Sequence, residues 1–437
     1  MYSLTYNAIH NAITDYIFLI HTCFILLWEY FMYSMGRPID NCVKNVSRKL
    51  GNINMFYVKA FQSISSNSQL LSREQIEFLS SYTDTVPFGP DDIDIHFRDA
   101  IADVNKNNDN NDNTLSIPHF AIPIKSGMIA LIYEGFIGKK KVIIKVARRN
   151  IRHRLSTALR QIDLLFRALA FLLQLQSLHI EDIISENRDM MIMQTDFKNE
   201  LNNIITMREK YKNIDTIVIP RPYKEYTDAY ENIIVMDYLE GNTVMQIANE
   251  DRKVYSNQLS HFSLKGVLFD RIIHADLHPG NVIFLKDNMG TCKLGIIDYG
   301  VMLTITKQQQ NDFFNFAYAF IIEKDSEKAF DIIVNSFIEP ISNEECTIIN
   351  KNKFIKEIGN IIEASLSKNI TIQSSDIYLI NKILYTHRYR LTKAFCKIEM
   401  ALAIADSICK QLNGGNSYID NIAETAAKIL TPDICAF

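Results

Sequence analysis

The sequence is poor in the features that mark secreted, zinc-binding and nucleic-acid-binding proteins. Its 7 cysteines are scattered over 437 residues, and none of them forms a Cys-x-x-Cys pair. This argues against a disulfide framework and against a zinc site, and it fits a reducing compartment. An excess of positive charge is also missing, because the formal net charge is -4. We therefore expect no nucleic-acid partner.

The start of the chain also lacks the pattern of a targeting peptide. The first arginine is Arg37 and an acid, Asp15, comes early, whereas transit peptides are rich in arginine and poor in acids. No lysine or arginine precedes the first apolar stretch, as the start of a secretory signal would require. We therefore expect an intracellular protein.

Residues 12–35 are strongly apolar and are interrupted by His21 and Glu29. The uninterrupted part is too short to span a bilayer, which takes about 20 apolar residues, although the whole segment would nearly reach. Two interpretations stay open. The favoured one is a buried helix packed on the rest of the chain. The other is a helix that dips into a membrane or crosses it, which would make lipid a partner and the protein membrane-associated.

Two polar motifs follow each other closely in the second half of the chain. Residues 274–281 read His-Ala-Asp-Leu-His-Pro-Gly-Asn, and residues 298–300 read Asp-Tyr-Gly. In kinase-type catalytic loops, the spacing between Asp276 and Asn281 lets the aspartate face a substrate hydroxyl while the asparagine oxygen faces a metal ion. Asp298 offers a second metal ligand, and the glycine after it lets the backbone turn sharply.

Each motif alone is more often a polar turn or the end of a strand. The two in this order, with Ile-Ile before the second aspartate, indicate phosphoryl transfer. We predict that Asp276 is catalytic and that Asn281 and Asp298 bind magnesium and, through it, ATP.

A lysine inside an apolar strand provides a further candidate. Residues 128–136 and 141–146 are predicted to form two strands joined at residues 137–140. Lys145 lies in the second strand, where it is costly unless it is paired. It is either an edge-strand lysine that faces water or the lysine that binds the α- and β-phosphates of ATP. Glu200, on a predicted helix, is the best candidate partner, so Lys145 and Glu200 join the predicted catalytic residues.

A kinase would place a Gly-x-Gly-x-x-Gly loop before this lysine strand, and the sequence lacks one. Residues 126–130 read Ser-Gly-Met-Ile-Ala instead, so the nucleotide phosphates must be covered in another way. Ser126, Gly127 and Ala130 are the candidate nucleotide contacts here.

Residues 233–241 are predicted to form a strand that runs into a glycine turn. In a kinase this strand would be the hinge whose backbone binds adenine. Met236 and Tyr238 are the candidate residues for that contact. Taken alone, the pattern predicts a strand and indicates no particular function.

The organisation that follows is an α+β, two-lobed protein-kinase-like fold. We expect an N-terminal helical extension over residues 1–104 and a disordered polar loop over residues 105–114, where Asn and Asp dominate. A small β-containing lobe is predicted over residues 115–240. A mainly helical lobe with the catalytic loop is predicted over residues 241–437.

Together these motifs resemble the UbiB/AarF/ADCK family of atypical protein-kinase-like proteins, from about residue 45 to about residue 320. Residues 274–281 are similar to the family's His-Ala-Asp-Pro-His-Pro-Gly-Asn, with Leu277 in place of proline, and residues 298–300 to its Asp-Phe-Gly. Asp196, Phe197, Glu200 and Asn203 match its Asp-Phe-x-x-Glu-Ala-x-Asn helix. Residues 59–62, Lys-Ala-Phe-Gln, resemble its Lys-x-Gly-Gln signature.

The resemblance implies ATP and magnesium as cofactors, and an ATPase or kinase acting near a membrane on a lipid or small-molecule pathway. It also implies a regulatory role for Lys59, Gln62 and Asp196, because in the family the signature helix folds over the active site and its lysine approaches an acidic pair. Two departures stand out. Phe61 replaces the signature glycine, and Gln194 replaces the first acid of the pair.

Two other functions stay open at this point. One is a small-molecule phosphotransferase of the aminoglycoside or choline kinase type, although residues 59–62 and the Asp196-Phe197 helix argue against it. The other is a catalytically silent, ATP-binding scaffold on a membrane, since intact ligands do not guarantee turnover. The sequence also leaves a homodimer open as a partner.

Overall fold

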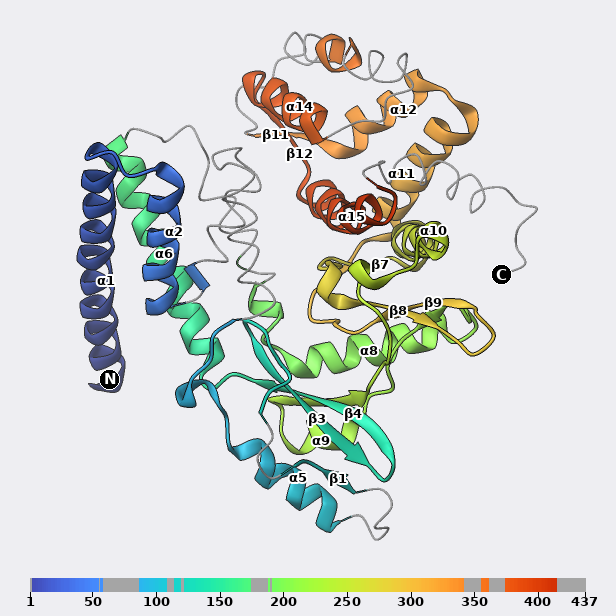
Figure 1. Cartoon of the computed structure of the whole chain (residues 1–437). Helices are drawn as coiled ribbons and strands as arrows, with labels where there is room; N and C mark the ends of the chain where they lie inside the picture. The colour runs from blue at the N-terminus through green and yellow to red at the C-terminus, as the bar shows by residue number, and fades with distance from the viewer. Residues whose placement is uncertain are drawn as a thin grey trace. The chain divides into compact units, whose positions relative to one another are not determined.

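The computed structural model (Figure 1) describes residues 2–54, 56–57, 86–107, 114–118, 122–173, 188, 191–341, 355–360 and 374–414. Lys59, Phe61 and Gln62 lie outside these residues. The chain divides into two compact units. The first comprises Met1–Leu201 and Pro222–Tyr238, and the second comprises Asn202–Arg221 and Leu239–Phe437.

The first unit is built on an antiparallel sheet. Its strands, in chain order, are β1 (Leu115–Ser116), β2 (Lys125–Ser126), β3 (Ala130–Ile137), β4 (Lys140–Ala147) and β6 (Ile233–Asp237). They run in the order β1-β3-β4-β6, with β2 also paired to β3. The predicted strand pair is therefore confirmed as the hairpin β3–β4. Gly138 has a positive φ of 58° in its tight turn, a conformation that glycine adopts without strain.

The first unit also contains helices. They are α1 (Tyr2–Ser34), α2 (Ile39–Ile53), the short η1 (Pro90–Asp92), α5 (His96–Lys106), α6 (Ile151–Leu173), α9 (Lys224–Ala229) and the first residues of α8 (Phe197–Tyr211). Helix α5 includes Asn105, which the sequence placed in a disordered loop. Its side chain donates to the Leu115 carbonyl at 2.8 Å and accepts from the Leu115 amide at 3.0 Å. Residues 108–113 of that expected loop lie outside the described chain.

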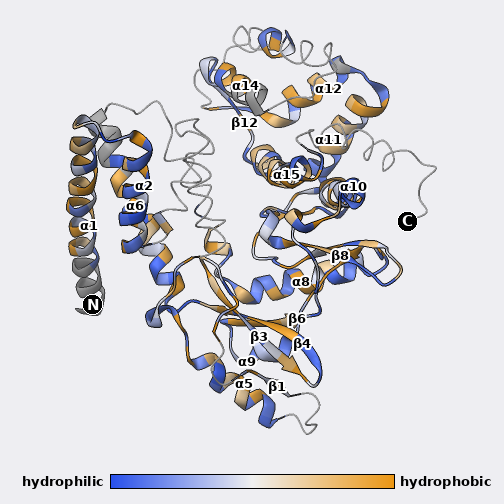
Figure 2. Cartoon of the chain, in the orientation of Figure 1, coloured by the Kyte–Doolittle hydropathy of each residue, from blue (hydrophilic) through white to orange (hydrophobic). Residues whose placement is uncertain are grey.

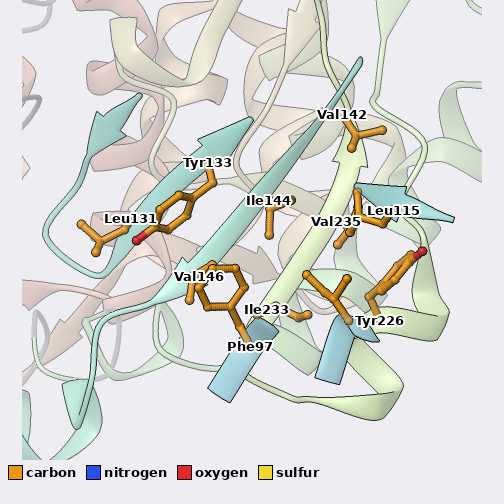
Figure 3. Packing of buried hydrophobic residues seen from close by; sticks show 11 residues of the cluster. Phe97, Leu115, Leu131, Tyr133, Val142, Ile144, Val146, Tyr226, Ile233 and Val235 are labelled. Carbon is orange, nitrogen blue, oxygen red and sulfur yellow. The ribbon is translucent and has the colours of Figure 1, made fainter. Parts of the chain in front are cut away.

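One face of the sheet forms the hydrophobic core of this unit (Figure 3). Alternate residues of β4, namely Val142, Ile144 and Val146, point into a cluster closed by Phe97 of α5 and Tyr226 of α9. Successive residues of a strand point to opposite faces. The same alternation therefore turns Lys145 away from this core, onto the other face of the sheet.

Helix α1 departs from the favoured interpretation of residues 12–35 as a buried helix. It packs against α2 and α6 along one stripe, but Ile17, Ile20, Phe24 and Leu27 are exposed. Within the described residues, one helix segment, Asn11–Ser34, is long and apolar enough to cross a membrane by length and composition. Core helices of soluble proteins and signal sequences also meet that criterion, so it does not choose between the interpretations.

The second unit is mainly helical. Its helices are the C-terminal part of α8, η4 (Val244–Gln246), α10 (Asn249–Lys265), η5 (Gly266–Asp270), η6 (Pro279–Asn281), α11 (Lys307–Ala317), η7 (Tyr318–Glu323), α12 (Ser326–Ile332), η8 (Ile333–Phe337), α14 (Ser374–Thr386) and α15 (Lys393–Leu412). Its strands are β5 (Ile217–Val218), β7 (Ile272–His274), β8 (Val282–Lys286), β9 (Cys292–Ile296), β10 (Met302–Thr304), β11 (Ile338–Pro340) and β12 (Tyr389–Leu391). The α+β class is therefore confirmed.

Short strand pairs position the two polar motifs of the second unit. Strand β7, which leads into the first motif, pairs with β10, which follows the second, with His274 opposite Met302. The hairpin β8–β9 connects the motifs, and Val282 lies opposite Ile296. The chain before this hairpin approaches it closely, because a Cβ on Gly241 would lie 2.7 Å from the Phe284 carbonyl oxygen. Glycine is therefore required at that position.

Candidate nucleotide-binding and catalytic site

A buried ion pair forms the centre of the site residues in the first unit. The Nζ atom of Lys145 lies 2.6 Å and 2.8 Å from the two carboxylate oxygens of Glu200. Lys145 is 8% exposed and Glu200 is 0% exposed. The Lys145 ammonium also lies 5.4 Å from the ring centre of Phe197. The structure thus brings together the lysine and glutamate that the sequence paired.

The position of Lys145 in the sheet decides between its two interpretations. Strand β4 is an interior strand, and Lys145 lies between Ile132 of β3 and Ile234 of β6. The interpretation as an edge-strand lysine facing water is therefore wrong. An ammonium held in this position is stabilised by the carboxylate opposite it, because an unpaired buried charge is costly.

Glu200 is positioned by the beginning of α8. The Asp196 carboxylate accepts from the Asn199 amide at 3.0 Å, which caps the N-terminus of the helix. Glu200 follows in the first turn, where its own amide donates to the Asp196 carbonyl at 3.0 Å. Asp196 is exposed. Its predicted regulatory partner, Lys59, lies outside the described residues, so that role stays a prediction.

The loop that replaces a glycine-rich motif is fixed by an arginine that the sequence analysis missed. Arg148, which is almost fully buried, donates through Nε to the Gly127 carbonyl at 3.0 Å and through Nη2 to the Ser126 hydroxyl at 2.8 Å. The Ser126 hydroxyl in turn donates to the Val86 carbonyl at 2.6 Å. The Gly127 amide donates to the Ala130 carbonyl at 2.9 Å. The loop is therefore a preformed turn inside the first unit.

Arg148 is balanced by a carboxylate on its other side. Its Nη1 lies 3.1 Å from Asp92, which also pairs with Arg154. Burial alone would raise the pKa of the Asp92 carboxyl, but hydrogen bonds from Arg154 and the Gly89 amide and the charge of Arg148 outweigh burial, so its pKa is lowered. An arginine directly after an apolar strand, three residues beyond Lys145, was the available signal in the sequence.

The predicted hinge residues end the first unit. Met236 lies in the β4–β6 ladder opposite Ile143. The Tyr238 amide donates to the Lys141 carbonyl at 3.3 Å, and the Lys141 ammonium lies 4.2 Å from the Tyr238 ring centre. The first unit ends at Tyr238. Contacts of Met236 and Tyr238 with adenine stay a prediction.

In the second unit, backbone bonds shape the loop that contains Asp276 and Asn281. The Asn281 side-chain nitrogen donates to the Asp276 carbonyl at 2.8 Å, and the Asn281 amide donates to the His278 carbonyl at 2.9 Å. The amide group of Asn281 is thereby oriented, with its nitrogen on the loop and its oxygen as the remaining acceptor. Asp276 itself is partly exposed. The five-residue spacing thus closes a loop, as the sequence motif suggested.

His274 links this loop to the second aspartate motif. Its Nε2 lies 2.5 Å from the Asp298 carbonyl oxygen, and its Nδ1 lies 3.3 Å from the Asp276 amide. A carbonyl accepts and an amide donates, so only the neutral ring with hydrogen on Nε2 satisfies both. Burial lowers the pKa of His274 and outweighs the bond to the Asp298 carbonyl and the charges of Asp298 and Asp276. His274 thus positions the backbones of Asp276 and Asp298, a role that the sequence analysis did not assign to it.

The turn that carries Asp298 is held from two further sides. The Asp298 carboxylate accepts from the Gly300 amide at 3.0 Å. The Asn203 side chain, on α8, donates to the Tyr299 carbonyl at 3.0 Å. Asn203 is the last residue of the helix motif Asp-Phe-x-x-Glu-x-x-Asn. Through Asn203 the motif holds the Asp298 turn of the second unit. Through Glu200 it pairs with Lys145 of the first unit.

Asn281 and Asp298, the candidate metal ligands of the second unit, suit magnesium better than a metal ion whose ligands all come from protein side chains. The described residues contain no group of three His, Cys, Asp or Glu side chains placed to bind a metal ion. Asn281 and Asp298 instead supply an amide oxygen and a carboxylate. Magnesium is commonly bound by one or two such oxygens, with waters and substrate phosphates completing its shell.

Comparisons with known proteins identify the family of the chain. Residues 100–333 match the model of the ABC1 atypical kinase-like domain. A probable protein kinase UbiB from Shewanella sp. (strain W3-18-1) is 24% identical over 380 residues, which cover 80% of this chain and 66% of that protein. An uncharacterised chloroplastic aarF domain-containing protein kinase from Arabidopsis thaliana is 23% identical, covering 80% of this chain and 48% of that protein. The chain thus spans less than two thirds of these relatives.

Solved structures show weaker similarity. The complex of Rv3197 with erythromycin from Mycobacterium tuberculosis has a TM-score of 0.45 at 14% identity, covering 74% of this chain and 85% of that one. The Rio2 kinase from Chaetomium thermophilum has a TM-score of 0.29 at 14% identity, covering 82% of this chain and 94% of that one. The family match covers more than half of the chain and decides the assignment. The chain belongs to the ABC1 atypical kinase-like domain family, the UbiB/AarF/ADCK family that its motifs resemble, and it has that family's protein-kinase-like fold.

Proposed function

We propose that the protein is a magnesium-dependent, ATP-binding atypical kinase or ATPase. The observation that carries this proposal is the buried pair of Lys145 and Glu200. Burying two charges between strand β4 and helix α8 is costly for folding, and a hydrophobic pair would serve stability as well. Such a pair is explained by a role for the lysine in binding anionic phosphates. The loop of Asp276 and Asn281 and the turn of Asp298 support the same proposal.

In the first unit, Lys145 would contact the α- and β-phosphates, and the turn of Ser126, Gly127 and Ala130 would lie against the phosphates. Met236 and Tyr238 would contact adenine, as the sequence analysis proposed. Arg148 would keep the turn in place, so that it needs no rearrangement when the nucleotide arrives.

In the second unit, Asn281 and Asp298 would hold magnesium. When bound, the ion supplies positive charge that offsets the charge of the phosphates. Asp276 would orient the attacking hydroxyl or water and accept its proton. His274, whose ring is neutral, would keep the backbones of Asp276 and Asp298 at a fixed separation.

The substrate would be small or lipid-like rather than a protein. By resemblance to the family, the segment of Lys59 and Gln62 would fold over the active site, and Phe61 stands where the family has glycine. A buried Phe side chain is worth about 1.5–3 kcal/mol, whereas the partly exposed charge pair lost at Gln194 is worth about 0–1 kcal/mol. Steric closure should therefore outweigh the lost charge. Contact with a membrane through residues 12–35 would bring the site near lipid substrates.

The test combines binding and turnover. Thermal unfolding with ATP and magnesium should shift upwards in the wild type, and the shift should be lost in Lys145→Met. Lys106→Met is the control, because Lys106 lies in the same unit and pairs with Asp103 at an exposed site. An equal shift in Lys145→Met and wild type would refute the proposal. ATP binding without any release of phosphate, with or without liposomes, would favour the alternative of a silent ATP-binding scaffold.

A further inference from the structure

Helix α1 has its polar side facing the protein and its apolar side facing outwards. The stripe that packs on α2 and α6 consists of buried residues at alternating spacings of three and four: Asp15, Phe18, Thr22, Ile25 and Glu29. Three of these five are polar or charged. A helix on a water-soluble domain has the opposite arrangement, with apolar residues inside and polar residues outside.

The two carboxylates of the inner stripe anchor the helix to its neighbours. Asp15 accepts from Arg160 of α6 at 2.7 Å and 2.9 Å. Glu29 accepts from Arg37 at 2.6 Å and from Lys49 of α2 at 2.8 Å. Burial raises the pKa of Glu29, but the bonds from Lys49 and Arg37 outweigh it, so its pKa is lowered and it stays ionised. The anchors lie 14 positions apart in sequence, about 21 Å along a helix.

With histidine counted as neutral, the outer face carries no charged side chain between Asn11 and Met35, because Asp15 and Glu29 are the only charges in that range and both face inwards. The polar side chain of His21 is exposed. Figure 2 shows apolar residues along the coloured part of α1. The exposed large apolar residues of this face are Ile13, Tyr16, Ile17, Ile20, Phe24, Leu27, Trp28, Tyr30 and Phe31. At about 100° per residue they spread over roughly half of the helix circumference.

The breadth of this face bears on what covers it. A second copy of α1 packed alongside would cover only a narrow stripe of this face, because two paired helices contact each other mainly through heptad positions a and d. A face of about half the circumference would leave residues on both flanks in water. A lipid layer, in contrast, covers the whole face at once. Trp28, Tyr30 and Tyr33 follow each other near one end, and these residue types favour the boundary between lipid headgroups and hydrocarbon.

The neighbours of α1 bear on its orientation. Asp15 and Glu29 are held by Arg160, Arg37 and Lys49, so charged groups of α2 and α6 accompany α1 near both of its anchors. A spanning α1 would carry these charges into hydrocarbon, which is costly. A helix that lies in the plane of the membrane keeps them on the water side. Such helices have their apolar face about 5–10 Å deep in the boundary region.

We propose that α1 lies flat in one leaflet of a lipid bilayer, with its outer face inserted and with Asp15 and Glu29 facing the protein. The proposal deepens the membrane contact in the proposed function and decides between a helix that crosses the membrane and one that lies on it. It does not depend on whether the protein binds or hydrolyses ATP.

Tryptophan fluorescence can test this directly, because Trp28 is the only tryptophan in the chain. The full-length protein is mixed with vesicles of phosphatidylcholine with roughly one third phosphatidylglycerol, the anionic fraction being chosen to favour interfacial helices. Quenching by lipids brominated at shallow or deep acyl positions then measures depth. The experiment is repeated with Trp28→Phe/Ile20→Trp, which moves the single probe to the middle of the helix.

A flat helix predicts a blue shift and strongest quenching by shallow bromines for both probes. Deep quenching of the probe at position 20, with shallow quenching at Trp28, would mean that α1 spans the bilayer and would overturn the proposal. A blue shift that depends on protein concentration and not on vesicles would point to a second copy. If vesicles cause neither a blue shift nor quenching, the proposal is also refuted.

A pair of matched variants gives the second measurement. Ile17 and Ile20 on α1 are 61% and 70% exposed, and Ile122 and Ile124 in the same unit are 54–75% exposed. Ile17→Glu/Ile20→Glu should weaken co-sedimentation with vesicles about tenfold to a hundredfold, given the apolar burial that is lost. Ile122→Glu/Ile124→Glu should leave it unchanged. Equal effects of both pairs would contradict a specific role of α1.

ATP binding of the same variants keeps the two proposals apart. Ile17→Glu/Ile20→Glu should retain the stabilisation by ATP and magnesium that the wild type shows. If the wild type is not stabilised by ATP but binds vesicles through α1, the proposed function fails and the docking of α1 stands. If the wild type is stabilised by ATP but does not bind vesicles through α1, the docking of α1 fails and the proposed function stands.

Discussion

Removing one partner of the Lys145–Glu200 pair should destabilise the first unit strongly. In Lys145→Met, the Glu200 carboxylate, which is 0% exposed, loses the ammonium at 2.6 Å and 2.8 Å. Breaking a buried ion pair by removing one partner costs about 3–5 kcal/mol. In Lys141→Met, a partly exposed pair with Glu134 is lost, and such pairs are worth about 0–1 kcal/mol. Urea unfolding followed by far-ultraviolet circular dichroism measures both.

The double variant Lys145→Met/Glu200→Met separates the charge from the packing. Replacing both buried partners by apolar side chains is often neutral or stabilising, so the double variant should recover most of the stability that the single variant loses. It should still fail to bind ATP. If Lys145→Met costs no more than Lys141→Met, or if the double variant is less stable than the single one, the pair does not have the buried, charged character described here.

Further outcomes follow from the other contacts. Asp276→Asn should keep ATP affinity but lose turnover, and a loss of affinity as severe as in Asp298→Asn would mean that the roles are wrongly divided. Phe61→Gly should change the nucleotide off-rate measured by stopped flow, because a bulky side chain is removed. An unchanged off-rate would refute the steric argument. Robust phosphorylation of a generic protein substrate by the wild type would also refute it. For Glu29, the folded pKa lies below the ordinary 4.5, so its contribution to stability is present above that value and is lost as pH falls through the folded pKa. The stability difference between wild type and Glu29→Gln should thus be larger at neutral pH than at pH of about 3; a constant difference would contradict the ion pairs.

Local patterns predicted the parts of the fold that alternate regularly. The β-branched run of residues 142–146 predicted a strand, and in the structure Lys145 of that strand lies on the face opposite Val142 and Ile144. The pairing with Glu200 could be proposed because the motif fixed the spacing along α8. Neither inference needed long-range information beyond the motif.

Long-range contacts account for what the sequence did not reveal. Arg148 holds together segments 86–87, 92 and 126–127, which no periodicity connects. The polar composition near Asn105 predicted disorder from that residue onwards. The Asn105 side chain instead pairs with the Leu115 backbone, and α5 includes Asn105. The apolar stretch of α1 predicted burial, but the partners of Asp15 and Glu29 determine which side faces inwards.

Magnesium-dependent binding of ATP tests the central claim most directly. Isothermal titration of the wild type with ATP should give saturable binding with magnesium and much weaker binding with a chelator, because the proposed function has Asn281 and Asp298 contact the nucleotide through the ion. Asp298→Asn should reduce binding in the presence of magnesium towards the chelator value. Equal affinity with magnesium and with chelator, or no binding under either condition, would contradict the account.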